Sequence, residues 1–140
     1  MPSIRFMTED IRFVFKNRTK TKEWIKNIIL IENKTLGNIN FIFTSDAYLQ
    51  ELNVKYLKHN TLTDVITFND NDSVIINGDI FISVERVKEN SVIYMQTFIE
   101  ELKRVIIHGV LHLLLYNDKL ISEKKRMREM EDKCLKLFPN

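Results

Sequence analysis

The chain has 140 residues, 44% of them hydrophobic, and a net charge of +2 at pH 7. That is enough chain for one domain with its own core, so we expect a single domain over residues 1–140. The composition argues against a membrane anchor, because the longest apolar run, about 12 residues, is well short of the ~20 that span a bilayer. Cys134 is the only cysteine, which excludes an internal disulfide framework and favours a reduced, cytoplasmic protein.

The first part of the chain alternates strand patterns with helix patterns. Residues 3–7 predict a short strand, and residues 21–32 predict an amphipathic helix capped by Thr21. Gly37 favours a turn, and the alternation over residues 38–44 predicts a second strand. We therefore expect a strand, a helix and a strand in that order.

The middle of the chain predicts a helix followed by a pair of strands. Ser45 is the expected cap of a helix that continues to about residue 57. Residues 64–68 and 78–84 are β-rich runs separated by a polar segment, so we expect them to pair antiparallel. The phenylalanines in strand positions are expected in the core rather than on a surface that stacks RNA bases; they are Phe41, Phe43, Phe68 and Phe81.

The last part of the chain predicts two helices. Thr97 and Glu100 have the spacing of a capping box, which predicts a helix to about Tyr116. Ser122 with Glu123 predicts the start of the last helix. Its expected inward stripe is Met127, Met130, Cys134 and either Leu137 or Phe138. The order of elements, βαβαββαα, indicates an α+β domain.

His108 and His112 are four residues apart in the most apolar segment of the chain. On a helix this spacing places both imidazoles on one face, where they can bind one metal ion. The alternative is that each ring is buried against a backbone carbonyl, but the apolar flanking residues offer no side-chain partner. Asp118 follows on an expected turn that could bring its carboxylate back to the rings. Three protein ligands with one open position are typical of a catalytic zinc site.

Other polar residues are weaker candidates for the site. Asp64 and Asp79 stand at strand entries, where a carboxylate more often bonds backbone amides than takes part in catalysis. His59 is a spare third ligand, distant in sequence from the histidine helix. Cys134 fits a small buried hydrophobe better than a metal ligand. No residue identifies itself as the general base.

The segment around the histidines resembles the H-G-x-L-H-L-x-G-Y-D-H signature of the YbeY family, metal-dependent endoribonucleases of bacterial ribosomal RNA maturation. Residues 52–68 resemble the family's L-N-x-x-Y-R-x-x-D-x-P-T-D-V-L-S-F block, and residues 78–83 resemble its G-D-I-x-I-S strand. Met127 and Glu131 fall where its last helix carries M-x-x-x-E. These blocks occur in the family's order and cover most of the chain.

The resemblance implies a mixed four-stranded sheet with surrounding helices and a central metal-binding helix. It implies a single-strand-specific endoribonuclease of ribosomal RNA maturation and ribosome quality control. Ribosomal RNA or the small ribosomal subunit would be its partner. The implied metal ligands are His108, His112 and Asp118, around one divalent cation for which Zn²⁺ is expected.

Three departures from the family pattern bear on the site. Asp118 stands at the signature's third histidine; a carboxylate can bind zinc, but an anionic ligand is expected to acidify bound water less. Leu115 stands at the signature's glycine, where a left-handed leucine would cost ~1–2 kcal/mol unless Asn117 makes the turn instead. Leu57 replaces an arginine thought to help activity or RNA contact in the family.

RNA needs cations along its path, for which the candidates are Lys55, Lys58, His59 and Arg86. Lys55 or Lys58 could replace the charge missing at position 57, though not the two-pronged donor of an arginine. The basic run at residues 124–128 is expected to be a solvated helix face, whose charge could still meet ribosomal RNA.

Two rival functions stay open. A zinc peptidase would share the histidine spacing, but Gly109 stands where those enzymes carry a glutamate base, and glycine cannot transfer a proton. A non-catalytic ribosome-assembly factor would use the metal only to tie the helix to the turn that follows it. Leu57 and Asp118 make the assembly factor credible.

Overall fold

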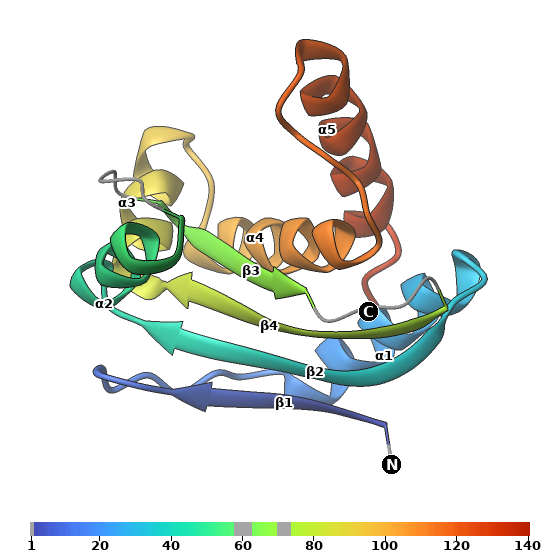
Figure 1. Cartoon of the computed structure of the whole chain (residues 1–140), viewed down its shortest axis with the longest axis horizontal. Helices are drawn as coiled ribbons and strands as arrows, with labels where there is room; N and C mark the ends of the chain where they lie inside the picture. The colour runs from blue at the N-terminus through green and yellow to red at the C-terminus, as the bar shows by residue number, and fades with distance from the viewer. Residues whose placement is uncertain (1, 58–62, 70–73) are drawn as a thin grey trace.

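The computed structural model describes residues 2–57, 63–69 and 74–140. Its elements in chain order are β1 (Ser3–Thr8), α1 (Arg18–Ile31), β2 (Thr35–Thr44), α2 (Asp46–Leu52), a π-helical turn (Asn53–Leu57), β3 (Val65–Asn69), β4 (Ile75–Ser83), α3 (Val84–Ile93), α4 (Phe98–Leu113) and α5 (Ile121–Leu135). The predicted α+β class with a mixed four-stranded sheet is confirmed (Figure 1).

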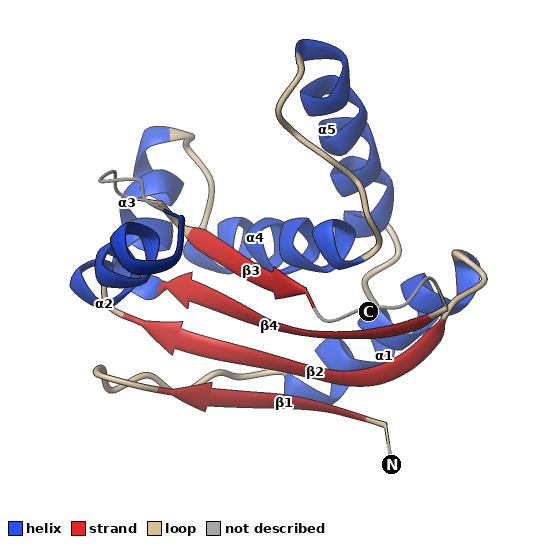
Figure 2. Ribbon diagram, in the orientation of Figure 1, coloured by secondary structure: helices blue, strands red, loops and turns tan. Residues whose placement is uncertain are grey.

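The sheet has the strand order β1-β2-β4-β3. β2 pairs in parallel with β1 and with β4, whereas β3 pairs antiparallel with β4 as expected. Parallel neighbours need crossover connections, and α1 supplies the one between β1 and β2. β3 is left as an edge strand on the side of the sheet nearest α4 and α5 (Figure 2).

Helix α4 lies along the sheet and is buried over most of its length, with Leu102, Ile106 and Val110 among its core residues. It begins with the predicted capping box, in which Thr97 and Glu100 each satisfy the other's backbone amide. α4 contacts both β3 and β4, and α5 crosses it near its C-terminal end (Figure 1). The histidine helix is therefore at the centre of the fold, as expected.

Two local predictions for the first helix and the following turn are wrong. α1 begins at Arg18, and the residue before it is Asn17 in the left-handed conformation, so Thr21 is a buried interior residue rather than the cap. Gly37 lies inside β2, and the turn is made earlier by Asn33. Asparagine tolerates the left-handed region, which explains both shifts. Gly37 instead permits close approach, since a Cβ there would overlap the Asn77 side chain.

Sequence patterns missed α3 altogether. β4 ends at Ser83, and the Ser83 hydroxyl at once caps α3 by accepting from the Arg86 amide. The predicted helix over residues 45–57 is real but changes form. Ser45 caps α2 as expected, and the final turn after Leu52 is π-helical.

The inward stripe of α5 is largely as predicted. Met127 and Cys134 are buried, and Phe138 rather than Leu137 packs on the core. Burial raises the pKa of the Cys134 thiol to about 11, as suits a small core residue. The Trp24 indole N–H donates to the Cys134 carbonyl at 2.7 Å, which ties α1 to the end of α5.

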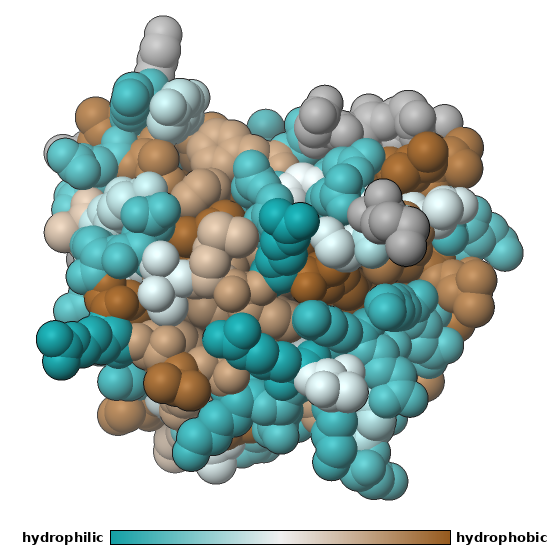
Figure 3. Space-filling view, turned by 90° about the horizontal axis from the view of Figure 1, so that it is seen from below, coloured by the Kyte–Doolittle hydropathy of each residue, from teal (hydrophilic) through white to brown (hydrophobic). Residues whose placement is uncertain are grey.

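Among the described residues, no helix is long and apolar enough to cross a membrane. α4, which holds the longest apolar run, has 16 residues. The face seen from below mixes hydrophilic residues with separate hydrophobic patches (Figure 3).

Gly109 sets how closely α4 approaches the sheet. A Cβ at this position would lie 2.7 Å from Ile80 Cγ2, and Ile80 is fully buried on the central strand β4. Gly109→Ala should therefore lower the free energy of unfolding by about 1–2 kcal/mol, because overpacking outweighs the ~1 kcal/mol gain in helix propensity. Urea unfolding of the variant measures this, with exposed Lys124→Ala as control. A more stable Gly109→Ala protein would show that the contact can relax.

Candidate metal centre

Three predicted ligands converge at the C-terminal end of α4. His108 Nε2 and His112 Nε2 lie 2.9 Å apart, as the one-turn spacing requires. Asp118 Oδ2 lies 3.3 Å from each of these nitrogens. Among the described residues, these three form the group of side chains that could share one metal ion.

The triangle of donors has the size that a small cation needs. Donors arranged tetrahedrally around zinc at about 2.0–2.1 Å lie roughly 3.3–3.4 Å from one another. Two of the observed separations are 3.3 Å and the third is 2.9 Å, so little movement would be needed. Two imidazoles and one carboxylate also form a donor set that zinc accepts. The residues therefore fit the metal that the sequence implies.

The turn after α4 delivers Asp118. Leu115 has φ 72°, its amide donates to the His112 carbonyl, and the Tyr116 amide donates to the Leu111 carbonyl. These two bonds define a Schellman motif, whose left-handed position usually holds glycine. Leu115 occupies that position, so the alternative of a left-handed turn at Asn117 is wrong. The chain reverses direction there and brings the carboxylate back to the rings.

Glu131 of α5 holds the ring of His108 from behind. Its Oε2 lies 2.6 Å from His108 Nδ1, and its side chain is only 6% exposed. Arg104 donates to Glu131 Oε1 at 2.7 Å and to Asp132 Oδ1 at 2.7 Å. A bond at Nδ1 directs the Nε2 lone pair toward the donor triangle. Sequence analysis did not assign this role, although the matched M-x-x-x-E pattern had marked the position.

The two imidazoles have pKa values that are shifted in opposite directions. Burial lowers the pKa of His108, but the hydrogen bond and charge of Glu131 outweigh it, so that pKa is raised. Burial and the neighbouring His108 lower the pKa of His112. Burial raises the pKa of Glu131, but the hydrogen bonds from His108 and Arg104 outweigh burial, so that this pKa is lowered overall. Glu131 is thus the ionised partner, and His112 favours the neutral form that binds metal.

The donors line a groove of about 620 Å³ that follows the outer edge of β3. Its lining includes Leu57, Asp64, Thr67 and Lys119 beside the three donors. Burial raises the pKa of the Asp64 carboxyl, to which Asn90 Nδ2 donates at 3.5 Å. Asp64 thus lies close to the donors, which its place in the sequence did not reveal. Asp79 lies on β4 and accepts from Asn40 Nδ2.

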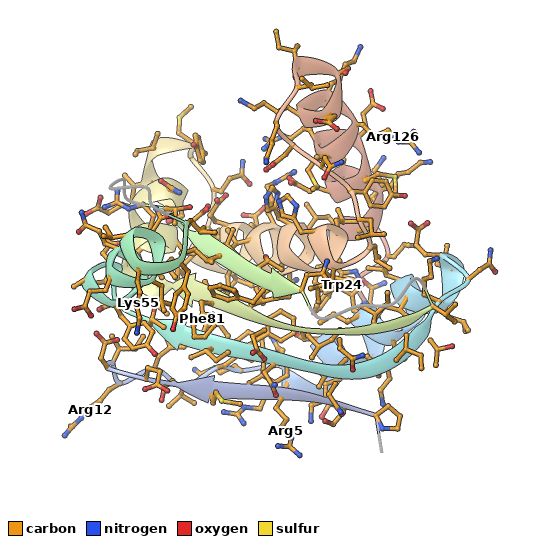
Figure 4. All side chains as sticks on the ribbon, in the orientation of Figure 1. Arg5, Arg12, Trp24, Lys55, Phe81 and Arg126 are labelled. Atoms are coloured by element: carbon orange, nitrogen blue, oxygen red, sulfur yellow. The ribbon has the colours of Figure 1, made fainter. Side chains whose placement is uncertain are left out.

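The proposed RNA contacts are dispersed. Lys55 lines a different hollow, beside Tyr48 and Tyr56, and Figure 4 shows it distant from Arg126 of α5. The Arg86 guanidinium is paired with Asp46 at 2.8 Å and with Glu89 at 2.8 Å. Lys58 and His59 lie outside the described residues.

Comparison with known proteins gives a family. The family described as "Endoribonuclease YbeY" matches residues 4–139 of this chain. The chain belongs to the YbeY family. The predicted family is thus confirmed, together with the enzyme class that defines it, hydrolases acting on RNA.

Individual YbeY proteins are similar over nearly the whole chain. An endoribonuclease YbeY of Flavobacterium psychrophilum is 50% identical over 129 residues, which are 92% of each chain. That of Amoebophilus asiaticus is 49% identical and covers 92% of this chain and 88% of its own. A solution structure from Thermotoga maritima superimposes with a TM-score of 0.67 at 28% identity, covering 97% of this chain and 89% of its own. The architecture is therefore that of a known YbeY-type fold.

The contact between Glu131 and His108 predicts a measurable loss of metal affinity. Glu131→Gln keeps the side-chain shape but removes the charge, and we expect zinc affinity to fall about 10–100-fold. Asp118→Ala, which removes a donor, should lower it at least as much. Competition with a chromophoric chelator measures the affinity, and Asp132→Asn is the control because it leaves the bond between Arg104 and Glu131 in place. Wild-type affinity in Asp118→Ala would remove that residue from the site.

Leu115 predicts a stabilising substitution. Its side chain is 62% exposed, so little burial is lost in Leu115→Gly. Relief of ~1–2 kcal/mol of left-handed strain should outweigh the ~0.5–1 kcal/mol entropy cost of glycine. We expect the free energy of unfolding of metal-free protein to rise by about 0.5–1 kcal/mol in urea. Leu115→Ala keeps the strain and should show no gain; equal gains in both would point to a cause other than backbone strain.

Proposed function

We propose that this chain is a metal-dependent endoribonuclease that cleaves single-stranded RNA in ribosomal RNA maturation and ribosome quality control, in the cytoplasm. Family membership supports the reaction class. The observation that carries the proposal is the position of the donor triangle: it lines a groove that also follows a strand edge, where a polymer can lie against it. Ribosomal RNA or the small ribosomal subunit is the proposed partner.

His108, His112 and Asp118 would hold the cation, and we propose Zn²⁺ because imidazole and carboxylate at these separations suit it. When bound, the ion supplies a Lewis acid for a phosphoryl oxygen and lowers the pKa of a water. Glu131 fixes the tautomer of His108, and Arg104 fixes Glu131. The chain's own residues thus keep the donors in place before RNA arrives.

RNA contact is proposed for Lys55, Lys58 and Arg86, with unequal weight. Lys55 is an exposed cation beside two tyrosines. Arg86 is already neutralised by Asp46 and Glu89, so its contribution to phosphate binding should be smaller. Lys119 adds an exposed cation to the metal groove itself.

A non-catalytic assembly factor is the second candidate, and Leu57 favours it. Leu57 lies in the metal groove, at the position where the family pattern has arginine, so the groove lacks that guanidinium. A zinc peptidase is disfavoured, because Gly109 faces Ile80 in the core and offers no base to the groove.

A labelled single-stranded oligoribonucleotide separates these functions. With zinc added, we expect the wild-type protein to cleave it, and His112→Ala to lower the rate by more than about 100-fold because a metal donor is lost. Circular dichroism checks that the fold is kept, and Lys124→Ala is the matched surface control. An inert wild-type protein that still binds the small ribosomal subunit would favour the assembly factor and contradict the enzyme.

A further inference from the structure

A second cleft, of about 210 Å³, lies beside the metal groove, between α4, α5, the start of β3 and the residue that follows α3. Asp64 and His108 line both hollows, so the cleft adjoins the metal centre. Its other lining residues include Glu101, Arg104, Arg128 and Tyr94. The volume is far more than one water needs and less than a drug-sized ligand occupies. The cleft is therefore of a size for one flat ring system.

The Glu101 side chain makes no hydrogen bond with the described residues. The residue is 5% exposed, and its carboxylate accepts no hydrogen bond from any described residue. Burial raises the pKa of the Glu101 carboxyl, and the charge of Asp64 raises it further. The charges of Arg104 and Arg128 act in the opposite direction but do not outweigh burial. Arg104 directs its donors to Glu131 and Asp132 instead. The oxygens of Glu101 are not among the fully enclosed side-chain atoms that lack a hydrogen bond, so the carboxylate reaches the open space of the cleft and can accept donors from a ligand there.

The chemistry of the cleft selects the ligand. An ionised carboxylate only accepts hydrogen bonds, so the ligand must present donors. On the Watson–Crick edge of guanine, the N1–H and the N2 amino group are adjacent donors that match one carboxylate. Uracil has a single N–H between two carbonyl oxygens, which a carboxylate repels. In a duplex this edge is paired, so only a single strand can offer it.

We propose that the cleft binds a guanine base of the RNA strand whose backbone crosses the metal centre, with Glu101 accepting from N1–H and the N2 amino group. This inference rests on the proposed function, because the guanine would belong to the RNA that the enzyme cleaves. Tyr94, 58% exposed at the C-terminal end of α3, provides the stacking surface. Arg128, exposed on α5, adds positive charge at the rim.

Nucleoside binding tests the cleft without any cleavage. Guanosine and uridine are titrated separately into metal-free protein while the amide resonances are followed by NMR. We expect guanosine to shift resonances around Glu101 and Tyr94 and to bind at least about tenfold more tightly than uridine. Glu101→Gln offers one acceptor and one donor in place of two acceptors, so the preference should disappear. Equal binding, no binding, or shifts confined to other parts of the molecule would overturn the proposal.

Two tyrosine variants keep the test informative if Glu101→Gln folds poorly. Tyr94→Ala should weaken both nucleosides by the same factor and leave their ratio unchanged. Tyr56→Ala is the matched control, since Tyr56 is similarly exposed but lines a different hollow. An effect of Tyr56→Ala as large as that of Tyr94→Ala would contradict the location.

Different results would overturn the guanine site and the endoribonuclease function. Cleavage of RNA without base preference, together with no guanosine binding, would overturn the cleft and leave the endoribonuclease intact. Guanosine binding at the cleft by a protein that cleaves no RNA would retain the cleft and overturn the enzyme.

Discussion

The polar residues on one side of α4 constrain the elements around it. They stand at helical spacing on a helix that is otherwise mostly buried, at positions Glu101, Arg104, His108 and His112. Buried polar groups need partners, and neighbouring elements supply them for Arg104 and the two histidines. Glu131 of α5 bonds both Arg104 and His108, and the turn after α4 brings Asp118 to both imidazoles. The position of α5 and the sharp turn before it thus provide partners for the polar side chains of α4.

This arrangement couples stability to chemistry. The donors and their supports come from α4, α5 and the turn between them, so a cation bound to the donors would also tie these elements together. Replacing the family's third histidine by Asp118 keeps three donors but lowers the net charge of the loaded centre by one. A less positive centre acidifies water less, so activity at higher pH is the expected consequence.

What the sequence could predict depends on how local each cause is. The capping box at Thr97 and the spacing of His108 and His112 are set within one or two helical turns, and both predictions are confirmed as structure. α3 was missed because Ser83 ends a β-rich run and caps a helix at the same time. The bond from Glu131 to His108 joins residues 23 apart, so only the crossing of α5 over α4 reveals it. The isolation of Glu101 likewise depends on where Arg104 directs its donors.

Leu57 stands in the groove where the family pattern has an arginine, so a different residue would have to bind phosphate there. An arginine can bind a phosphate with two donors at fixed geometry, whereas Lys119, the described cation of that groove, offers one strongly hydrated point charge. Phosphate binding by a lysine alone would leave the direction of an RNA strand in the groove poorly fixed, because one point charge sets no orientation. A base held in the adjoining cleft would restore that orientation from the other side of His108. The same base would give the Glu101 carboxylate the hydrogen-bond donors that no described residue provides.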